Sequence, residues 1–394
     1  MTMNKKKVIF VTEKLIMGGV EKSLLEWIKI LAPYMEITVA VMHLGGELET
    51  EIGKHATIRL LSDEQFHFRQ IVARKIKKGK VIDVLQMLRA VNHARRDKSY
   101  INQCSNRIYE IDKIDEEFDY AVCFHKPTDI LVPYTSMRIN AKCKILWFHT
   151  EVSETVQMDK DGYKKAYQKY DKFVCVSKAV SKQLEEFLSD RKKDIYTIYN
   201  FFDKDTIYKK SELEPVKFGN EKKSIKIVTV GRLSWEKGQD IAIESARIMK
   251  EKDIKFVWNF IGDGPSYTEL HGLTKKYGLE KQVIFLGGMK NPYPYIKKCD
   301  IYVQPSREEG YGMTVAEAKL LQRAIVITDF LTAGEHIQNG ENGYIVPINQ
   351  SELALKIMCL IKRPEKREQF SHNLKGYNYP VECKEKIYEL FGIS

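Results

Sequence analysis

Two glutamates eight residues apart, Glu309 and Glu317, lie where a short apolar run gives way to a glycine-containing turn. Residues 301–304 predict a buried strand, and the apolar spacing over 313–322 predicts a helix. A strand, turn and helix in this order point free backbone N–H groups at an anion. Because carboxylates repel phosphate, we expect both glutamates to accept hydrogen bonds from sugar hydroxyls beside the anion. The alternative is a surface pair of glutamates that flanks an ordinary turn.

The stretch Glu309-Gly-Tyr-Gly-Met-Thr-Val-Ala-Glu317 resembles the Glu-x7-Glu motif of retaining glycosyltransferase family 4, within the GT-B structural class. The resemblance implies that Glu309 contacts the sugar of a nucleotide-sugar donor and Glu317 contacts the ribose. It also implies that the turn amides lie against sugar and phosphate. The turn residues concerned are Gly310, Tyr311, Gly312 and Met313.

A second loop, Gly231-Arg-Leu-Ser-Trp-Glu-Lys-Gly-Gln-Asp240, follows a strand predicted over 225–230 and opens a helix. Its cations, Arg232 and Lys237, lie at a helix N-terminus, where an anion is already favoured. The same family has Gly-Arg and Lys-Gly here, and the resemblance implies that both cations bind the donor's diphosphate. They would stabilise the leaving nucleoside diphosphate electrostatically. The alternative is a cation pair on a solvated loop.

We expect no metal and no cofactor, because these cations take the place of a divalent ion. Two Asp-x-Asp triplets, at 159–161 and 203–205, lack the preceding apolar strand of a metal loop and are interpreted as chance. A glycosidase would also use two carboxylates, but it would not need cations at a diphosphate site. A nicotinamide-dependent oxidoreductase is disfavoured because the glycine fingerprint is missing.

The first half of the chain offers glycines and histidines at predicted strand ends. Gly18 and Gly19 follow the first strand and precede a helix, where the family carries a Gly-Gly loop. His149 resembles the family's strand-end histidine, which approaches the donor sugar and reaction centre. His125 could line the acceptor side, and His336 adjoins a later loop. A structural, hydrogen-bonded imidazole is the alternative for each of them.

Two further turns resemble family segments near the nucleotide. Gly262 and Asp263 follow a strand predicted over 256–261, and Gly288 lies in a turn whose backbone meets the base in the family. None of these residues specifies the base.

The order of predicted elements indicates an α/β fold of the GT-B class, with two Rossmann-like domains facing across a central cleft. Strands are predicted over 6–11, 36–42, 119–124, 144–148, 172–176, 194–199, 225–230, 256–261, 283–286, 301–304, 324–328 and 344–346. The expected domains are residues 1–200 for acceptor binding and 201–378 for the nucleotide-sugar. Residues 379–394 are expected to form a helix that crosses back to the first domain.

The composition indicates the compartment in which we expect the protein and the surfaces it could bind. The 394 residues carry a formal charge of +11, and no apolar run is long enough for a membrane span. Seven scattered cysteines and an N-terminus unlike a signal peptide indicate reduced thiols in a cytoplasmic protein. Between Arg69 and Arg107, eleven basic residues face two acids, Asp83 and Asp97, with apolar residues at partly helical spacing.

That basic segment fits an anionic membrane surface or a solvated helical face, and we expect no nucleic acid partner because no reading motif accompanies it. Together these features predict a retaining hexosyltransferase with a nucleotide-sugar donor, a UDP-sugar favoured. The expected acceptor is a lipid-linked saccharide in bacterial envelope or capsule assembly, and the expected location is the cytoplasm, with peripheral attachment to the inner face of the cell membrane. The alternative function is a non-catalytic GT-B subunit that stabilises a partner glycosyltransferase.

Overall fold

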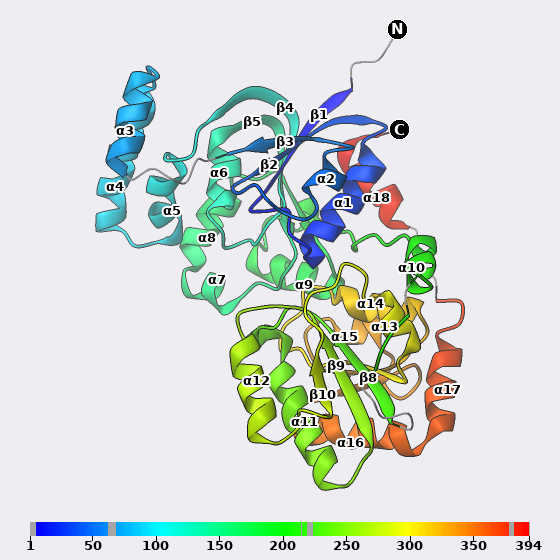
Figure 1. Cartoon of the computed structure of the whole chain (residues 1–394). Coiled ribbons are helices and arrows are strands. Elements are labelled where there is room, and N and C mark those ends of the chain that lie inside the picture. The colour runs from blue at the N-terminus through cyan, green and yellow to red at the C-terminus, as the bar shows by residue number, and fades with distance from the viewer. Residues whose placement is uncertain (1–4, 62–67, 214, 219–223, 378–381, 394) are drawn as a thin grey trace. The chain divides into compact units, whose positions relative to one another are not determined.

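A computed structural model describes residues 5–61, 68–213, 215–218, 224–377 and 382–393 (Figure 1). The chain divides into two compact units. Unit 1 comprises Met1–Phe201 with Glu382–Ser394, and unit 2 comprises Phe202–Val381. Each unit has a parallel β-sheet with its own apolar core. No helix within the described ranges is long and apolar enough to cross a membrane.

Unit 1 is built on a seven-stranded parallel sheet in the order β3-β2-β1-β4-β5-β6-β7. Its inner strands are buried along most of their length because helices cover parallel sheets on both faces. The strands are β1 (Lys6–Thr12), β2 (Met35–Val41), β3 (Thr57–Leu60), β4 (Ile114–Cys123), β5 (Ile139–Phe148), β6 (Lys172–Cys175) and β7 (Ile195–Thr197). Strand β3 was not predicted, because this four-residue edge strand is largely exposed and lacks an apolar run.

The helices of unit 1 connect these strands and include a C-terminal helix that returns from unit 2. They are α1 (Gly19–Leu31), α2 (Glu49–Ile52), α3 (Phe68–Lys77), α4 (Val81–Arg96), α5 (Tyr100–Ile108), α6 (Leu131–Arg138), α7 (Glu154–Met158), α8 (Lys160–Tyr167), α9 (Lys178–Phe187) and α18 (Glu382–Phe391), with a 3-10 turn at Lys192–Asp194. On α18, Phe391 packs edge-on against Tyr120 of β4 and close to Phe10 of β1.

Helices α3, α4 and α5 replace the single basic segment seen in the sequence. A buried ion cluster anchors them: Lys75 is fully buried, with its Nζ 3.4 Å from Asp83 and 3.2 Å from Asp112. Arg138 of α6 donates two hydrogen bonds to Asp83, at 3.0 and 2.7 Å. Removing these charges from water costs free energy. The net contribution of the cluster to the stability of unit 1 therefore depends on how well its cations and carboxylates are paired.

Unit 2 has a six-stranded parallel sheet in the order β10-β9-β8-β11-β12-β13. Its strands are β8 (Ile225–Val230), β9 (Phe256–Ile261), β10 (Val283–Phe285), β11 (Ile301–Gln304), β12 (Ala324–Thr328) and β13 (Tyr344–Val346). Its helices are α10 (Lys204–Ser211), α11 (Gln239–Glu251), α12 (Tyr267–Lys276), α13 (Tyr293–Lys298), α14 (Met313–Leu320), α15 (Ala333–His336), α16 (Gln350–Lys362) and α17 (Pro364–Asn373), with a 3-10 turn at Trp235–Lys237. The predicted strands of this half are present, within one residue at their ends.

Candidate functional site

The switch point of the unit 2 sheet lies between β8 and β11. These strands are neighbours, but the chain leaves β8 for β9 on one side and leaves β11 for β12 on the other. Ligands of open α/β sheets bind outside the carboxyl ends of the strands at such a point. The loop after β8 carries Arg232 and Lys237, and the loop after β11 carries Glu309. The topology therefore brings the two motifs of the sequence to one place.

Lys237 and Glu309 form an ion pair across the switch point. The Nζ of Lys237 is 2.8 Å from Oε2 of Glu309, and the two side chains are 23% and 9% exposed. The other oxygen, Oε1, accepts from the Ser306 hydroxyl at 2.8 Å and from the Gln304 amide at 3.2 Å. Both carboxylate oxygens are thus held in place before a ligand arrives. The sequence placed the two residues in separate motifs and did not predict this pair.

A buried glutamine supports Glu309 from behind. The Oε1 of Gln304 accepts from the Tyr302 hydroxyl at 2.7 Å and from the Thr314 hydroxyl at 3.1 Å. Burial raises the pKa of Tyr302 well above its usual value, so its hydroxyl stays a donor. With its acceptor side occupied, Gln304 turns its NH₂ group to Ser306 and Glu309. Sequence reasoning missed Gln304, whose signal was a buried polar residue at the end of an apolar strand.

Arg232 is the exposed cation of the site. Within the part of the chain that the structure describes, its guanidinium forms no ion pair, while its carbonyl accepts from the Gln239 amide at 2.8 Å. The adjacent Gly238 has φ +65°, and a Cβ there would lie 2.0 Å from the carbonyl oxygen of Pro305. The loops after β8 and β11 therefore touch through their backbones, which fixes Lys237 relative to Glu309.

The turn before α14 is held from the next loop. Gly312 caps the helix with φ +85°. The carbonyl of Tyr311 accepts from Nε2 of His336 and from the Thr332 hydroxyl at 3.3 Å. Burial lowers the pKa of His336 to about 3, so its ring is neutral and carries its hydrogen on Nε2. The Val315 and Ala316 amides donate to the carbonyl of Gly312, at 3.0 and 3.2 Å, so the first amides of α14, those of Met313 and Thr314, precede the helical hydrogen bonds and are available to an anion.

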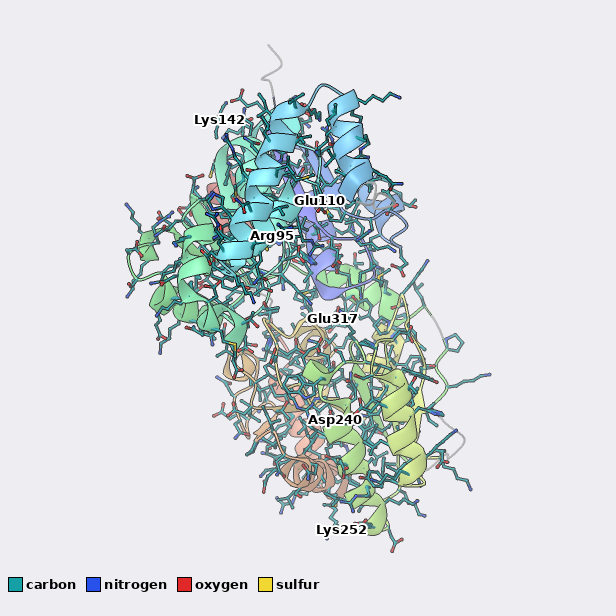
Figure 2. The ribbon with its side chains drawn as sticks, turned by 90° about the vertical axis from the view of Figure 1, so that its left-hand side faces the viewer. Arg95, Glu110, Lys142, Asp240, Lys252 and Glu317 are labelled. Atoms are coloured by element: carbon teal, nitrogen blue, oxygen red, sulfur yellow. The ribbon has the colours of Figure 1, made fainter. Side chains whose placement is uncertain are left out.

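Glu317 lies on α14 with its side chain 3% exposed. The Tyr293 hydroxyl of α13 donates to its Oε1 at 3.0 Å. Figure 2 labels Glu317 in unit 2, together with Asp240 and Lys252 at the two ends of α11. Glu309 and Glu317 thus belong to one loop and helix, and each is oriented by a neighbouring hydroxyl.

The turns after β9 and β10 interlock with the loop after β8. Gly262 has φ +146°, and a Cβ there would lie 2.0 Å from the carbonyl oxygen of Gly231. Asp263 accepts from the Gly288 amide at 2.6 Å through its side chain, and its carbonyl accepts from the Leu233 amide at 3.0 Å. The structure thus gathers the predicted residues Gly262, Asp263 and Gly288 beside the cation loop, with Asp263 bracing the turns.

In unit 1, the predicted residues lie at the carboxyl edge of the sheet. Gly18 caps α1 and Gly19 is its first residue; the carboxylate of Glu21 folds back so that a Cβ on Gly18 would be 2.2 Å from it. His149 follows β5 and is 8% exposed. Burial, with a smaller contribution from His125, lowers the pKa of His149 to about 3. Its Nε2 finds no hydrogen-bond partner among the described residues.

The first aspartate of each Asp-x-Asp triplet acts as a helix cap. Asp159 accepts from the Gly162 amide at the start of α8, and Asp203 accepts from the amides of Asp205 and Thr206 at the start of α10. Across the described ranges, no cluster of three or more His, Cys, Asp or Glu residues has the arrangement of a metal site.

Solved structures share this fold over nearly the whole chain. HepE of Anabaena in complex with UDP and glucose superposes with a TM-score of 0.71 at 19% identity, covering 98% of this chain and 99% of that one. A glycosyltransferase from Rickettsia africae superposes with a TM-score of 0.67 at 17% identity, covering 99% and 98%. The two-sheet architecture is that of the GT-B class.

Residues 210–376 match the model of a protein family described as glycosyl transferases group 1. The matched region contains both motifs, and the match confirms the resemblance to this family that they show. An uncharacterized glycosyltransferase of Methanocaldococcus jannaschii is 31% identical over 220 residues, which is 55% of this chain and 57% of that protein.

A second relative comes from Campylobacter jejuni and is named N-acetylgalactosamine-N,N'-diacetylbacillosaminyl-diphospho-undecaprenol 4-alpha-N-acetylgalactosaminyltransferase. It is 28% identical over 211 residues, which is 53% of this chain and 56% of that protein. The chain thus spans a little over half the length of these two relatives.

Proposed function

We propose that the protein transfers a sugar from a nucleotide-sugar to a saccharide acceptor, with retention of anomeric configuration and without a metal ion. The observation that carries this proposal is the Lys237–Glu309 pair at the switch point, beside the exposed Arg232. A diphosphate joined to a hydroxylated sugar suits this arrangement. It would meet a cation held by a carboxylate, a second cation in the same loop, and the free amides of α14.

In the proposed reaction, the bond between the anomeric carbon and the diphosphate oxygen breaks, and a bond from that carbon to the acceptor oxygen forms on the same face. The acceptor's proton leaves with the nucleoside diphosphate. Arg232 and Lys237 stabilise the charge that develops on the departing diphosphate. Glu309 accepts from a sugar hydroxyl, and Glu317 accepts from the ribose. The donor binds unit 2, and the acceptor binds unit 1.

A UDP-sugar is the favoured donor, and a lipid-linked saccharide is the favoured acceptor. The solved structure of HepE is described in complex with UDP and glucose, which supports the first choice. The name of the Campylobacter relative includes a diphospho-undecaprenol acceptor, which supports the second. The proposed setting is envelope or capsule assembly at the inner face of the cell membrane.

Donor binding can be followed by intrinsic fluorescence, because all four tryptophans lie in the described part of the chain and three of them are fully buried. Trp235 is 62% exposed and lies between Arg232 and Lys237. Arg307 lies 4.9 Å from the centre of its ring and is itself paired with Asp240 at 2.8 and 2.6 Å. Trp235 is therefore a fixed reporter at the diphosphate site.

We expect a nucleoside diphosphate to protect Trp235 from acrylamide quenching in the presence of EDTA. UDP, GDP and ADP are compared, and one of them is expected to bind at least about tenfold more tightly than the others. Trp235→Phe should abolish the optical response while calorimetry still detects binding. No response and no calorimetric binding with any nucleotide would contradict the donor site, and binding that requires added Mg²⁺ would contradict metal independence.

The exposed face of α4 supports a membrane-held acceptor. Its first half presents apolar side chains to solvent, including Val81, Leu85 and Ile82, which is 73% exposed. Its second half presents Arg89 and a basic end that includes Arg95, labelled in Figure 2. An interfacial helix typically inserts apolar side chains into the headgroup region of the membrane. Its neighbouring cations contact anionic lipids.

Substituting Arg89, Arg95 and Arg96 with Gln is expected to weaken partition onto phosphatidylglycerol vesicles by about 10²-fold, since each such cation contributes about 1 kcal/mol near an anionic surface. Sedimentation with vesicles measures the effect. The matched control replaces Lys182, Lys192 and Lys193, three exposed lysines elsewhere on unit 1, and removes the same charge. Equal losses in both triple variants, or equal binding of the unmodified protein to neutral vesicles, would contradict a specific membrane face.

A further inference from the structure

The unit 1 sheet has its own switch point, between β1 and β4, and it carries a polar cluster that the donor site does not use. The chain leaves β1 for β2 on one side and leaves β4 for β5 on the other. Glu13 follows β1, and His125 follows β4. The Nε2 of His125 lies 3.2 Å from Oε2 of Glu13 and 3.9 Å from Oδ2 of Asp129.

This cluster is preorganised by its backbone. The carbonyl of Glu13 accepts from the amides of Met42 and His43, at 2.9 and 3.0 Å, which ties it to the end of β2. Asp129 accepts from the Leu131 amide at 2.9 Å through Oδ1, and its carbonyl accepts from the Tyr100 hydroxyl at 2.6 Å. Its remaining oxygen, Oδ2, is the one that faces His125.

Two buried polar atoms at the same sheet edge have no partner among the described residues. One is Nε2 of His149, whose ring lies 4.2 Å from that of Phe124, the residue before His125. The other is the hydroxyl of Thr12, the last residue of β1 and the neighbour of Glu13. Both side chains are more than nine-tenths buried. Leaving such atoms unpaired is costly, so they indicate hydrogen bonds that a ligand completes.

The charge of the cluster selects the ligand. Burial lowers the pKa of His125, and Asp129 and Glu13 act against that lowering. Lys126, the next residue, is exposed and acts on His125 more weakly than either carboxylate. The cluster therefore offers carboxylate oxygens to donors and repels anions. Hydroxyl and ammonium groups suit it, whereas the carboxylate of a uronic acid or a phosphate does not.

We propose that Glu13, His125 and Asp129 bind the hydroxyl groups of the acceptor sugar and restrict it to a neutral or amino sugar, with His149 and Thr12 completing the contact. This inference rests on the proposed function, because it names the class of sugar that the transferase accepts. Glu13 and Asp129 are specificity-determining residues here, and they take no part in the diphosphate chemistry of unit 2.

Histidine-selective ¹³C NMR of the full chain tests this site with methyl glucoside, methyl glucosaminide and methyl glucuronide as probes. The signals of His125 and His149 are assigned with His125→Gln and His149→Gln. The neutral and amino glycosides are expected to shift both signals, and the glucuronide is expected to bind at least about tenfold more weakly. In Glu13→Gln, affinity for the neutral glycoside should fall about fivefold, which corresponds to one hydrogen bond, while the glucuronide should gain affinity.

Glu117→Gln is the matched control, since Glu117 is an exposed glutamate of β4 before its carboxyl end. Nucleotide protection of Trp235 is measured on the same samples and should be unchanged in Glu13→Gln. Absence of shifts with every glycoside up to the solubility limit, or equal binding of glucoside and glucuronide, would overturn the inference. If the nucleotide response is intact in that case, only the acceptor site fails; if it is lost in the unmodified protein, the transferase assignment fails.

Discussion

Lys237→Ala is expected to lower kcat/KM for sugar transfer by about 10²–10³-fold, the range found when one preorganised donor to a developing negative charge is removed. Lys237 is held by Glu309 at 2.8 Å, so its Nζ is already placed when the donor binds. Its removal takes away a charge at the leaving diphosphate and also leaves the 9%-exposed Glu309 without its cation. The rate of nucleoside diphosphate release from a UDP-sugar with acceptor present measures the effect.

The control is Lys252→Ala at the far end of α11, which Figure 2 shows away from Asp240 and the helix start. It removes an exposed lysine from the same unit and should change kcat/KM less than about twofold. The double variant Lys237→Ala with Glu309→Gln is expected to lose less than the sum of the two single losses in free energy, because paired residues act as a unit. Full additivity, or a Lys237→Ala enzyme within fivefold of the unmodified one, would contradict the role given to this pair.

Asp83→Ala is expected to destabilise unit 1 by about 3–5 kcal/mol, as breaking a buried ion pair from one side does. Asp83 joins the buried Lys75 of α3 to Arg138 of α6, so the change leaves Lys75 paired with Asp112 and removes the carboxylate that binds Arg138. Helices α3 and α4 should lose their anchor before the sheet unfolds. Urea unfolding gives the free energy, and hydrogen exchange identifies the helices that open.

The same cluster determines how the stability of unit 1 depends on pH. Burial raises the pKa of Asp83, but hydrogen bonds and charge from Arg138 and then Lys75 more than offset it and hold the pKa below its usual value. A carboxyl whose pKa is depressed by folding adds stability above its unfolded pKa and loses it as the pH falls through the folded value. The hydrogen-exchange protection of α3 and α4 should therefore decrease as the pH falls below the usual pKa of an aspartate. Asp83→Ala should remove this pH dependence.

Asp115→Ala serves as the comparison, because Asp115 is 77% exposed and lies 3.9 Å from Lys113. Such a surface pair contributes about 0–1 kcal/mol. If both aspartate variants lose the same small free energy, the ion cluster is not the anchor of these helices.

The sequence indicated which residues of the loops after β8 and β11 to examine, but it did not indicate the contacts that orient them. A glycine turn after an apolar strand is a local pattern, and it singled out Glu309, Glu317, Arg232 and Lys237 as candidates. The ion pair of Lys237 with Glu309 joins residues 72 positions apart, and only the order of the strands in the sheet brings them together. Local patterns carry no such information, so the pair was missed.

The supporting residues were missed for a related reason. Gln304 ends an apolar strand, and sequence periodicity treats it as the strand's polar boundary, although its side chain is buried and fully used. Glu13 has no distinguishing pattern in the sequence, and its partner His125 follows a strand more than a hundred residues away. The basic segment was predicted as partly helical, but its division into three helices depends on the buried cluster around Lys75.

Unit 1 is completed by residues that follow all of unit 2 along the chain. Helix α18 supplies Ile387, Leu390 and Phe391 to that core, each buried side chain contributing about 1.5–3 kcal/mol. Lys6 of β1 also donates through its Nζ to the carbonyls of Phe391 and Gly392. During translation, the ribosome makes β1 to β7 first, yet their core stays open until α18 emerges. The nascent chain therefore finishes unit 2, made without interruption, before it can close the unit it began with.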